Sequence, residues 1–336
     1  MIDNVAKLRE VQLELLREFS RVCDEHGLKW YAFFGTLLGA VRYEGYLPWD
    51  DDVDVAMPEA DYFELCRHKE WFGERYFLQT PLDEGYAHFA KLRKNGTTAY
   101  NLGLWYELRK GGHQGIPIDI IPLSEMFGSG CYHTPCLGSI KRNAVYLKEW
   151  FEPAGQIMFE GLTLRRPAKH RKILTEVYEN WDWPQGAEYC HPTFWFFDTE
   201  TGYEVYKKRY TGMLEGIEGK KLLLFGAADS LRVWLERFGL GDQVVCTFDN
   251  DPGKWGKKYY GIDVKNPADI PNMLDDDSRL IIVSLWHQEI GRQLESMGIK
   301  DYYVYINTYY DEKVGNKVVY KEDIPQGQST IQRWEG

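Results

Sequence analysis

The chain has 336 residues, of which 40 are lysine or arginine and 51 are aspartate or glutamate, and its formal net charge is −11. This length can hold two domains with separate cores, and the negative balance argues against a polyanion such as nucleic acid as a partner. No apolar run approaches the roughly 20 residues of a membrane span, and the first residues do not resemble a secretory signal. We therefore expect a cytoplasmic protein with reduced cysteines.

The first predicted element is a helix near the N-terminus. Apolar residues recur there every three or four positions, which is the period of one helix face. These positions are Val5, Leu8, Val11, Leu15, Phe19 and Val22. Charges of both signs lie between them, so the pattern indicates a helix that packs against the core of the protein and does not anchor it to a membrane.

The next segment, residues 31–47, predicts a short strand followed by Gly35-Thr36 and a helix that begins at about Leu37. Glycine lets the backbone approach a phosphate closely, and the amide groups at a helix start favour anions. Arg42 can add a fork of donors for phosphate oxygens. A Gly-Thr pair before a helix is common, however, and the plain alternative is that Thr36 caps the helix.

Four aspartates then fall within residues 50–54, where they alternate in part with valine. This alternation predicts a strand on which Asp52 and Asp54 face the same side. Two carboxylates at one strand edge suit Mg²⁺ or Mn²⁺, which also accept substrate phosphates as ligands. Asp50 has the same parity and is a further candidate ligand, whereas Asp51 points the other way and is expected to cap or pair locally. The mid-loop glycine and terminal glutamate of an EF-hand calcium loop are absent.

Two more charged motifs follow. Lys91 and Arg93 lie two apart on a strand predicted over residues 87–93, where they can neutralise phosphate charge or form a surface pair. Asp119 interrupts the apolar segment 116–121, which is costly unless the carboxylate is paired or binds a metal. Asp119 is therefore a candidate metal ligand or general base, the alternative being a buried salt bridge.

These motifs together resemble the signature of the LicD family, which is related to the fukutin group. The matching stretches are residues 35–42, 46–54 with Met57-Pro58, 88–98 and 115–123. The resemblance covers roughly the first 190 residues. It implies an α/β protein whose first domain is an α+β nucleotidyltransferase-type fold with a mixed sheet. It also implies transfer of phosphorylcholine, or another phospho-substituent, from a CDP-linked donor to a glycan or lipid-linked glycan, with release of CMP.

The resemblance assigns roles to the residues named above. It assigns catalysis and metal binding to Asp52, Asp54 and Asp119, with Asp50 as a further ligand. It assigns binding of the donor phosphates to Gly35, Thr36, Arg42, Lys91 and Arg93. A choline cargo would favour an aromatic cage, and the candidates are Trp49, Tyr100, Trp105 and Tyr106. The protein would reach the inner face of the membrane through its acceptor. Two alternatives are a nucleotidyltransferase acting on a small phosphorylated metabolite and a non-catalytic nucleotide- or sugar-binding protein that uses its C-terminal domain.

A group of cysteines and one histidine is a weaker candidate for a metal site. Its members are Cys131, His133, Cys136 and Cys190. They could supply soft zinc ligands, but their spacing fits no common zinc module. Free buried thiols are the alternative.

The remainder of the chain predicts a second domain. After residues 1–192 we expect a helical connector over 193–218, alternating strands and helices over 219–310 and an extension over 311–336. The alternation predicts a parallel, doubly wound, Rossmann-like sheet. Asp249 could reach a ribose hydroxyl there, but only Gly226 matches the glycine fingerprint of dinucleotide sites. A redox role is therefore not favoured.

Overall fold

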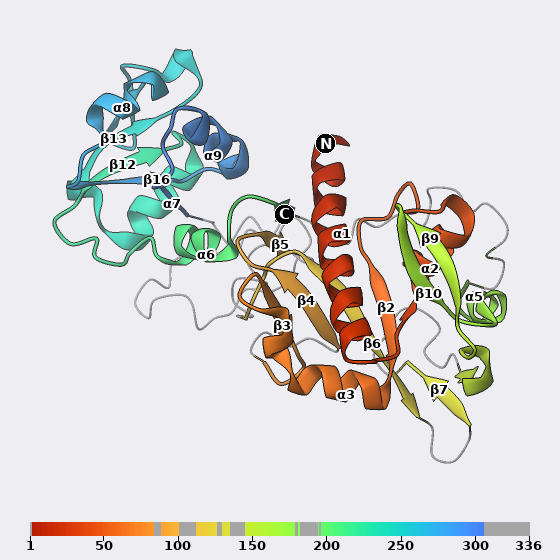
Figure 1. Cartoon of the computed structure of the whole chain (residues 1–336). Coiled ribbons are helices and arrows are strands. Elements are labelled where there is room, and N and C mark those ends of the chain that lie inside the picture. The colour runs from red at the N-terminus through yellow and green to blue at the C-terminus, as the bar shows by residue number, and fades with distance from the viewer. Residues whose placement is uncertain are drawn as a thin grey trace, which may run out of the picture. The chain divides into compact units, whose positions relative to one another are not determined.

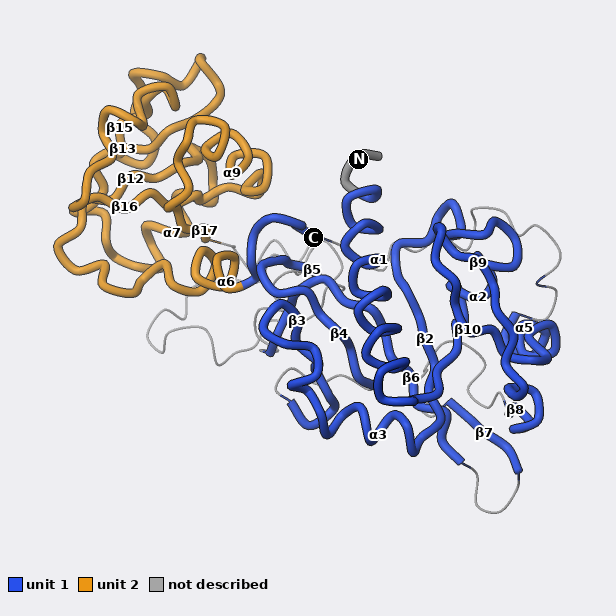
Figure 2. The backbone as a smooth tube through the Cα atoms, viewed as in Figure 1, with its two compact units in different colours: residues 1–203 blue, residues 204–336 orange. Residues whose placement is uncertain are grey.

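The computed structural model describes residues 2–83, 89–100, 112–125, 130–134, 145–178, 181, 194 and 196–305. The chain divides into two compact units, Met1–Tyr203 and Glu204–Gly336, which are coloured separately in Figure 2. Both units contain helices and strands, so the predicted α/β class is confirmed. Figure 1 labels many of the elements that are named below.

Within its described residues, the first unit contains a seven-stranded mixed sheet. Its main path runs β1 (Tyr31–Ala32), β2 (Asp54–Pro58), β6 (Pro117–Glu125), β4 (Ala90–Lys94) and β3 (Tyr76–Gln79). Two short strands, β7 (Cys131–His133) and β8 (Val145–Leu147), extend from β6. Strands β2 and β6 are parallel, whereas β4 is antiparallel to β6. Asp119 therefore lies on β6, the strand next to β2, which begins at Asp54.

Helix α1 (Ile2–Glu25) packs on this sheet against β4 and β6 (Figure 1). Its buried residues include Leu8, Leu15, Phe19 and Val22, so the predicted packing helix is confirmed. The other helices described in this unit are α2 (Phe34–Tyr43), α3 (Glu59–Arg67), η1 (Lys69–Phe72), η2 (Lys148–Trp150) and α5 (His170–Tyr178). Helix α3 contacts β2 and β6, whereas α2 contacts β2, β9 and α5. The sheet edge at which β2 begins therefore lies next to α2.

Two small antiparallel sheets complete the first unit. One pairs β9 (Gly155–Phe159) with β10 (Leu162–Arg166), and the other pairs β5 (Thr98–Tyr100) with β11 (Phe196–Asp198). Strand β11 lies within the segment predicted as a helical connector. It is a strand of the first unit because its backbone pairs with β5, a partner about a hundred residues earlier that no local pattern could indicate.

The second unit contains a six-stranded sheet among its described residues. Its order is β14 (Lys258–Tyr259), β15 (Ile262–Lys265), β13 (Val244–Phe248), β12 (Lys221–Phe225), β16 (Ser278–Ile282) and β17 (Tyr303–Val304). The pairs from β15 to β17 are all parallel, as predicted. The helices are α6 (Tyr203–Thr211), α7 (Asp229–Phe238), η4 (Gly241–Gln243), η5 (Pro252–Lys254), η6 (Pro267–Asp269), α8 (Ile270–Met273) and α9 (His287–Ser296).

Both faces of this second sheet are buried. Leu223 and Phe225 pack in one apolar cluster with residues of α9, whereas Leu222 and Leu224 pack in another with Trp234 of α7. Successive residues of a strand point to opposite faces, so helices cover the sheet on both sides. This is the arrangement expected of a parallel sheet.

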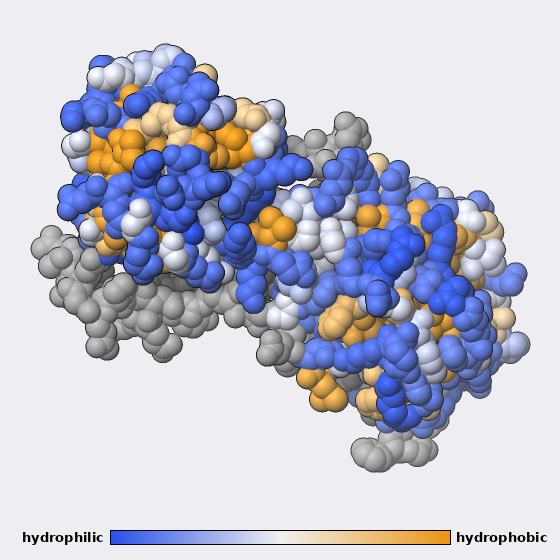
Figure 3. All heavy atoms as spheres, turned by 60° about the vertical axis from the view of Figure 1, so that its left-hand side comes forward, coloured by the Kyte–Doolittle hydropathy of each residue, from blue (hydrophilic) through white to orange (hydrophobic). Residues whose placement is uncertain are grey.

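The surface carries both hydrophilic and apolar residues. On the face shown in Figure 3, hydrophilic residues predominate, with smaller apolar areas between them. Among the described residues, no helix combines the length and the apolar character needed to cross a bilayer.

Candidate active site

Three charged side chains meet on adjacent strands of the first sheet. Asp54, the first residue of β2, is paired in register with Asp119 of β6, and Asp119 is paired in register with Lys91 of β4. Residues directly opposite one another in a sheet project from the same face. The Lys91 Nζ donates a 2.5 Å hydrogen bond to Asp119 Oδ1. The structure thus brings two predicted acids and one predicted cation together.

The start of α2 completes this arrangement, in a form that differs from the prediction. The helix begins at Phe34, not at about Leu37, so Gly35 and Thr36 lie inside its first turn. Thr36 is therefore not the cap: its Oγ1 accepts a 2.9 Å hydrogen bond from the amide of Asp54. A Cβ atom on Gly35 would lie 2.5 Å from Asp50 Oδ2. Glycine at this position thus leaves room for the carboxylate.

The carboxylates destabilise one another's charges. Burial raises the pKa of Asp50 to about 8, with further contributions from the charge of Asp52 and a hydrogen bond between the two carboxyl groups. Burial also raises the pKa of Asp54 well above its ordinary value, and the charges of Asp52 and Asp119 add to the rise. Lys91 opposes this effect without cancelling it. Additional positive charge would therefore stabilise the ionised site.

The donor set fits a hard divalent cation. In the described part of the chain, no three His, Cys, Asp or Glu side chains are grouped to hold a metal on their own. Mg²⁺ does not require such a group, because it commonly takes one or two carboxylates and completes its shell with water and substrate phosphates. Asp52 and Asp54 supply such a pair, and the mutual repulsion of the carboxylates favours a cation.

Asp51 has a structural position, although its partner is not local. Its Oδ2 accepts a 3.3 Å hydrogen bond from the amide of Phe194, 143 residues later in the chain. Its carbonyl oxygen accepts a hydrogen bond from Gln12 of α1. Gln12 and its neighbour Arg9 were not predicted to contact the acidic segment, because contact between segments distant in the chain has no sequence signal.

Tyr178 was also missed from the sequence. It is the last residue of α5, and burial raises the pKa of its phenol well above the ordinary value. The charges of Asp54, Asp50 and Asp52 raise it further. The phenol is thus within electrostatic reach of the carboxylates.

The two arginines that were predicted to bind phosphate donate hydrogen bonds to other groups of the protein. The guanidinium group of Arg42 donates to the carbonyl of Trp181. Arg93 is buried, and its guanidinium group donates to Gln79 Oε1 and to the carbonyl of Gly115, each at 2.7 Å. Arg93 shares a strand face with Lys91, and its role in phosphate binding stays a prediction.

Two of the four residues predicted for an aromatic cage are described, so the cage stays a prediction. Tyr100 is fully buried in β5 and stacks on Phe196 at 5.9 Å between ring centroids, so its ring does not face a ligand. Trp49 is partly buried against the core of the first unit. Trp105 and Tyr106 lie outside the described residues.

The candidate zinc ligands are only partly described. Cys131 and His133 lie two apart on β7, and His133 Nδ1 is 3.0 Å from the carbonyl oxygen of Ser124. Cys136 and Cys190 lie outside the described residues. The zinc site stays an expectation.

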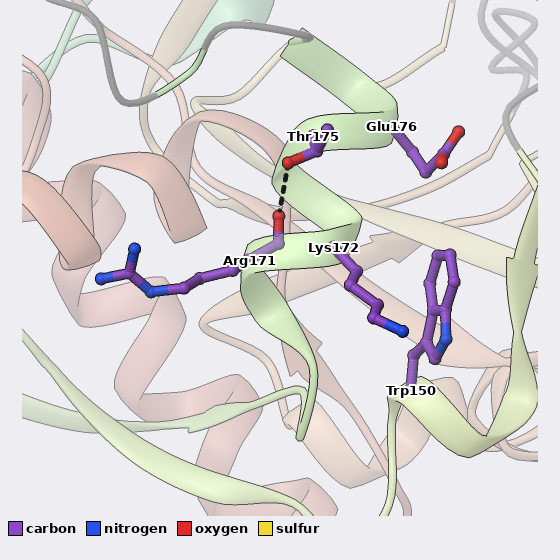
Figure 4. Close-up of a pocket in the computed structure, with 5 residues that line it drawn as sticks. All are labelled: Trp150, Arg171, Lys172, Thr175 and Glu176. Atoms are coloured by element: carbon purple, nitrogen blue, oxygen red, sulfur yellow. Dashed lines mark hydrogen bonds between the residues drawn. The ribbon is translucent and has the colours of Figure 1, made fainter.

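A cavity of about 300 Å³ lies beside α5, apart from the predicted site residues (Figure 4). Its lining consists of Trp150, Arg171, Lys172, Thr175 and Glu176. The Nζ of Lys172 lies 5.5 Å from the ring centroid of Trp150, whereas Arg171 points to the other side of the helix. The charges are mixed, so this cavity does not define a ligand.

In the second unit, Asp249 follows β13 as predicted, but its carboxylate accepts hydrogen bonds from other groups of the protein. Oδ2 accepts hydrogen bonds from the amide of Ala227 and from Lys254 Nζ, each at 2.9 Å. These contacts tie the end of β13 to the turn after β12. Binding of a ribose hydroxyl by Asp249 stays untested.

The segment that contains Asp54, Lys91 and Asp119 resembles a known protein family. Residues 27–169 match the model of the LicD/FKTN/FKRP nucleotidyltransferase domain. The chain is 38% identical over 82 residues to the lipopolysaccharide cholinephosphotransferase LicD of Haemophilus influenzae. The aligned residues make up 23% of this chain and 30% of that protein. An uncharacterized protein of Rickettsia prowazekii is 35% identical over 52 residues, 16% of this chain and 20% of that protein. The aligned parts thus span less than a third of either relative.

Proposed function

Residues 27–169 form a LicD-family nucleotidyltransferase domain, and on that premise we propose that the chain is a metal-dependent phosphotransferase. It transfers a phospho-substituent from a CDP-linked donor to a hydroxyl group of a glycan or lipid-linked glycan and releases CMP. The name of the Haemophilus relative supports phosphorylcholine as the first choice of cargo. The reaction would take place in the cytoplasm, at the inner face of the membrane when the acceptor is lipid-linked.

The observation that carries this proposal is the register of Asp54, Asp119 and Lys91 on three adjacent strands. Asp52 and Asp50 precede β2 and act electrostatically on Asp54. Phosphoryl transfer depends mainly on positioning and on neutralising the charge of the phosphates. Carboxylates for a cation, with a lysine beside them, supply both requirements.

Each residue has a distinct task in the proposed reaction. Asp52 and Asp54 would hold Mg²⁺ or Mn²⁺, which when bound neutralises charge on the donor diphosphate. The first turn of α2, with Gly35, presents amide groups to the phosphate oxygens. Lys91 holds the carboxylate of Asp119 in place and adds a positive charge at the same face.

The acceptor hydroxyl oxygen attacks the distal phosphorus of the donor. The bond from this phosphorus to the bridging oxygen breaks, and CMP leaves with the bonding electrons. Asp119 accepts the hydroxyl proton as general base. Arg42 and Arg93 stay candidate donors to the phosphate oxygens, and their guanidinium groups also donate to the carbonyls of Trp181 and Gly115.

Product analysis tests the proposal directly. The protein is incubated with Mg²⁺, a lipid-linked glycan extract and CDP-choline labelled separately in its cytidine and choline parts. Choline label on the glycan and cytidine label in free CMP are expected. Asp52→Asn and Asp54→Asn should each slow transfer by at least about 100-fold, as when a group that stabilises transition-state charge is lost. The exposed Asp24→Asn serves as the matched control.

Nucleotidyl transfer is the second candidate, because the matching family model describes a nucleotidyltransferase domain. In that reaction the nucleotide itself moves to the acceptor. Cytidine label on the acceptor would therefore overturn the phosphotransferase proposal and support this alternative. Unchanged transfer by both aspartate variants would exclude the proposed site for either reaction.

A further inference from the structure

The segment that carries the aspartates has no regular structure of its own. Residues 46–53 form neither helix nor strand, and β2 begins only at Asp54. Three successive carboxylates, Asp50, Asp51 and Asp52, repel one another within this segment. Only its last residue is tied to the sheet, where the carbonyl oxygen of Val53 accepts a 2.8 Å hydrogen bond from the amide of Asp119. Other groups must therefore hold Asp50, Asp51 and Asp52 in position.

Arg9 of α1 supplies much of that support. Its Nη2 donates to the carbonyl oxygens of Asp50 at 2.6 Å, of Leu47 at 3.0 Å and of Pro48 at 3.4 Å. Its Nε also donates to the carbonyl of Asp50, at 3.2 Å. The planar fork of the guanidinium group suits this convergence of acceptors. Arg9 therefore binds the backbone of the acidic segment through these carbonyl oxygens.

Gln12, one helical turn further along α1, extends the contact. Its side chain is fully buried, and its Nε2 donates to the carbonyl of Asp51 at 2.7 Å. Tyr46 joins the two residues: the guanidinium group of Arg9 lies 4.6 Å from its ring centroid, and its hydroxyl donates to Gln12 Oε1 at 3.2 Å. Positions three apart share one helix face, so a single face of α1 holds the segment.

We propose that Arg9 and Gln12 are positioning residues that pre-arrange the aspartates for a divalent cation. This inference rests on the proposed function, because it assumes a cation at Asp52 and Asp54. It also extends that function: α1 ends at Glu25, before the family match begins at residue 27. Part of the active-site support therefore comes from outside the matched domain.

Arg9 also brings a positive charge to the segment that carries the three successive carboxylates. The contacts to main-chain carbonyls hold the segment and the positive charge reduces its repulsion. Removal of Arg9 should therefore loosen residues 46–53 and weaken cation binding together.

Two readouts in the full-length protein test this inference. Mn²⁺ binding, followed by calorimetry, should be weaker by about 10- to 100-fold in Arg9→Ala, the range seen when groups that orient metal ligands are removed. Hydrogen exchange at residues 46–53 in metal-free protein should be faster by about tenfold or more, because the carbonyl contacts that resist local opening are lost. Arg9→Lys keeps the charge but not the fork, so it should be intermediate.

Arg21→Ala is the matched control, since Arg21 lies on the same helix and its ion pairs within the described residues are with Glu18 and Glu25 of α1. It should match the wild type in both readouts. If Arg9→Ala does not fold, Arg9→Lys decides: wild-type Mn²⁺ binding and exchange would overturn the inference. Failure of the wild type to bind Mn²⁺ would instead refute the metal site of the proposed function, and exchange would still test the contact itself.

Discussion

Gly35 shows how a single residue can set the space available to the site. A side chain there would meet the carboxylate of Asp50, with the added Cβ 2.5 Å from Oδ2. Gly39, one turn later in α2, faces a different obstacle, because a Cβ there would lie 2.4 Å from the carbonyl oxygen of Gly45. A carboxylate can rotate away, whereas the backbone of Gly45 cannot move as easily. The two glycines therefore have different roles.

We expect Gly35→Ala to lower activity and Gly39→Ala to lower stability. In Gly35→Ala the displaced Asp50 carboxylate should reduce transfer by about tenfold or more, since small misplacements of active-site groups can cost up to 100-fold. Its melting temperature should change little. Gly39→Ala should lower the free energy of unfolding by about 1–3 kcal/mol, as overpacking does.

Steady-state assays and thermal unfolding of both variants check this expectation. Gly241→Ala is the control, because a Cβ there would make only an ordinary 3.9 Å contact with Leu235. The interpretation fails if Gly35→Ala unfolds as readily as Gly39→Ala while keeping full activity.

At the scale of elements, one hydrogen bond joins α2 to β2. The Oγ1 of Thr36 accepts from the amide of Asp54, which is the residue where β2 starts. Asp54 also lies in register with Asp119. The hydroxyl group therefore connects the proposed phosphate-binding turn to the proposed metal ligands, and a change in one is transmitted to the other.

Replacement of Thr36 by valine tests this link. Valine has nearly the same shape but no acceptor, so the Asp54 amide would lose its partner at a cost of about 1–3 kcal/mol. Thr36→Ser keeps the hydroxyl and should retain most of the stability. Denaturant unfolding of the three proteins provides the measurement. Equal unfolding free energies for Thr36→Val and Thr36→Ser would show that the bond does not contribute.

The sequence predicted elements better than it predicted their contacts. The helical face of α1 and the apolar strand around Asp119 each depend on a local period or run. The alternation around Asp52 and Asp54 predicted a strand that carries both residues, but β2 begins only at Asp54 and residues 51–53 form no strand. The register that sets Lys91 against Asp119 follows from sheet pairing between distant segments. The interior place of Arg93 depends on Gln79 and Gly115, which no spacing links to it. Local patterns thus indicated which residues carry chemistry, and tertiary pairing decided which of them meet.

At the scale of the whole molecule, both units contain histidines that the fold keeps neutral. Burial lowers the pKa of His113 to about 3, and it lowers the pKa of His170 and of His287 to about 4. His113 and His170 belong to the first unit and His287 to the second. Protonation of these histidines at acid pH should therefore lower the stability of both units.

The sign of the effect follows from proton binding. A histidine in the unfolded chain titrates near 6.5, so between pH 6.5 and about 4 the unfolded state binds more protons than the native state. Stability therefore falls as the pH falls through this window. Each such histidine adds a slope of at most about 1.4 kcal/mol per pH unit.

His113 offers the clearest test of this acid sensitivity. Its Nδ1 accepts from the amide of Gly115 at 3.1 Å, and its Nε2 lies 2.7 Å from Asn95 Oδ1. Protonation of Nδ1 would break the first bond, so the neutral ring is required. We expect His113→Gln to be less stable than the wild type at pH 7 but to lose less stability between pH 7 and pH 5. The exposed His26→Gln is the control. Parallel stability curves for wild type and His113→Gln, from denaturant unfolding at each pH, would remove His113 as a cause of acid sensitivity.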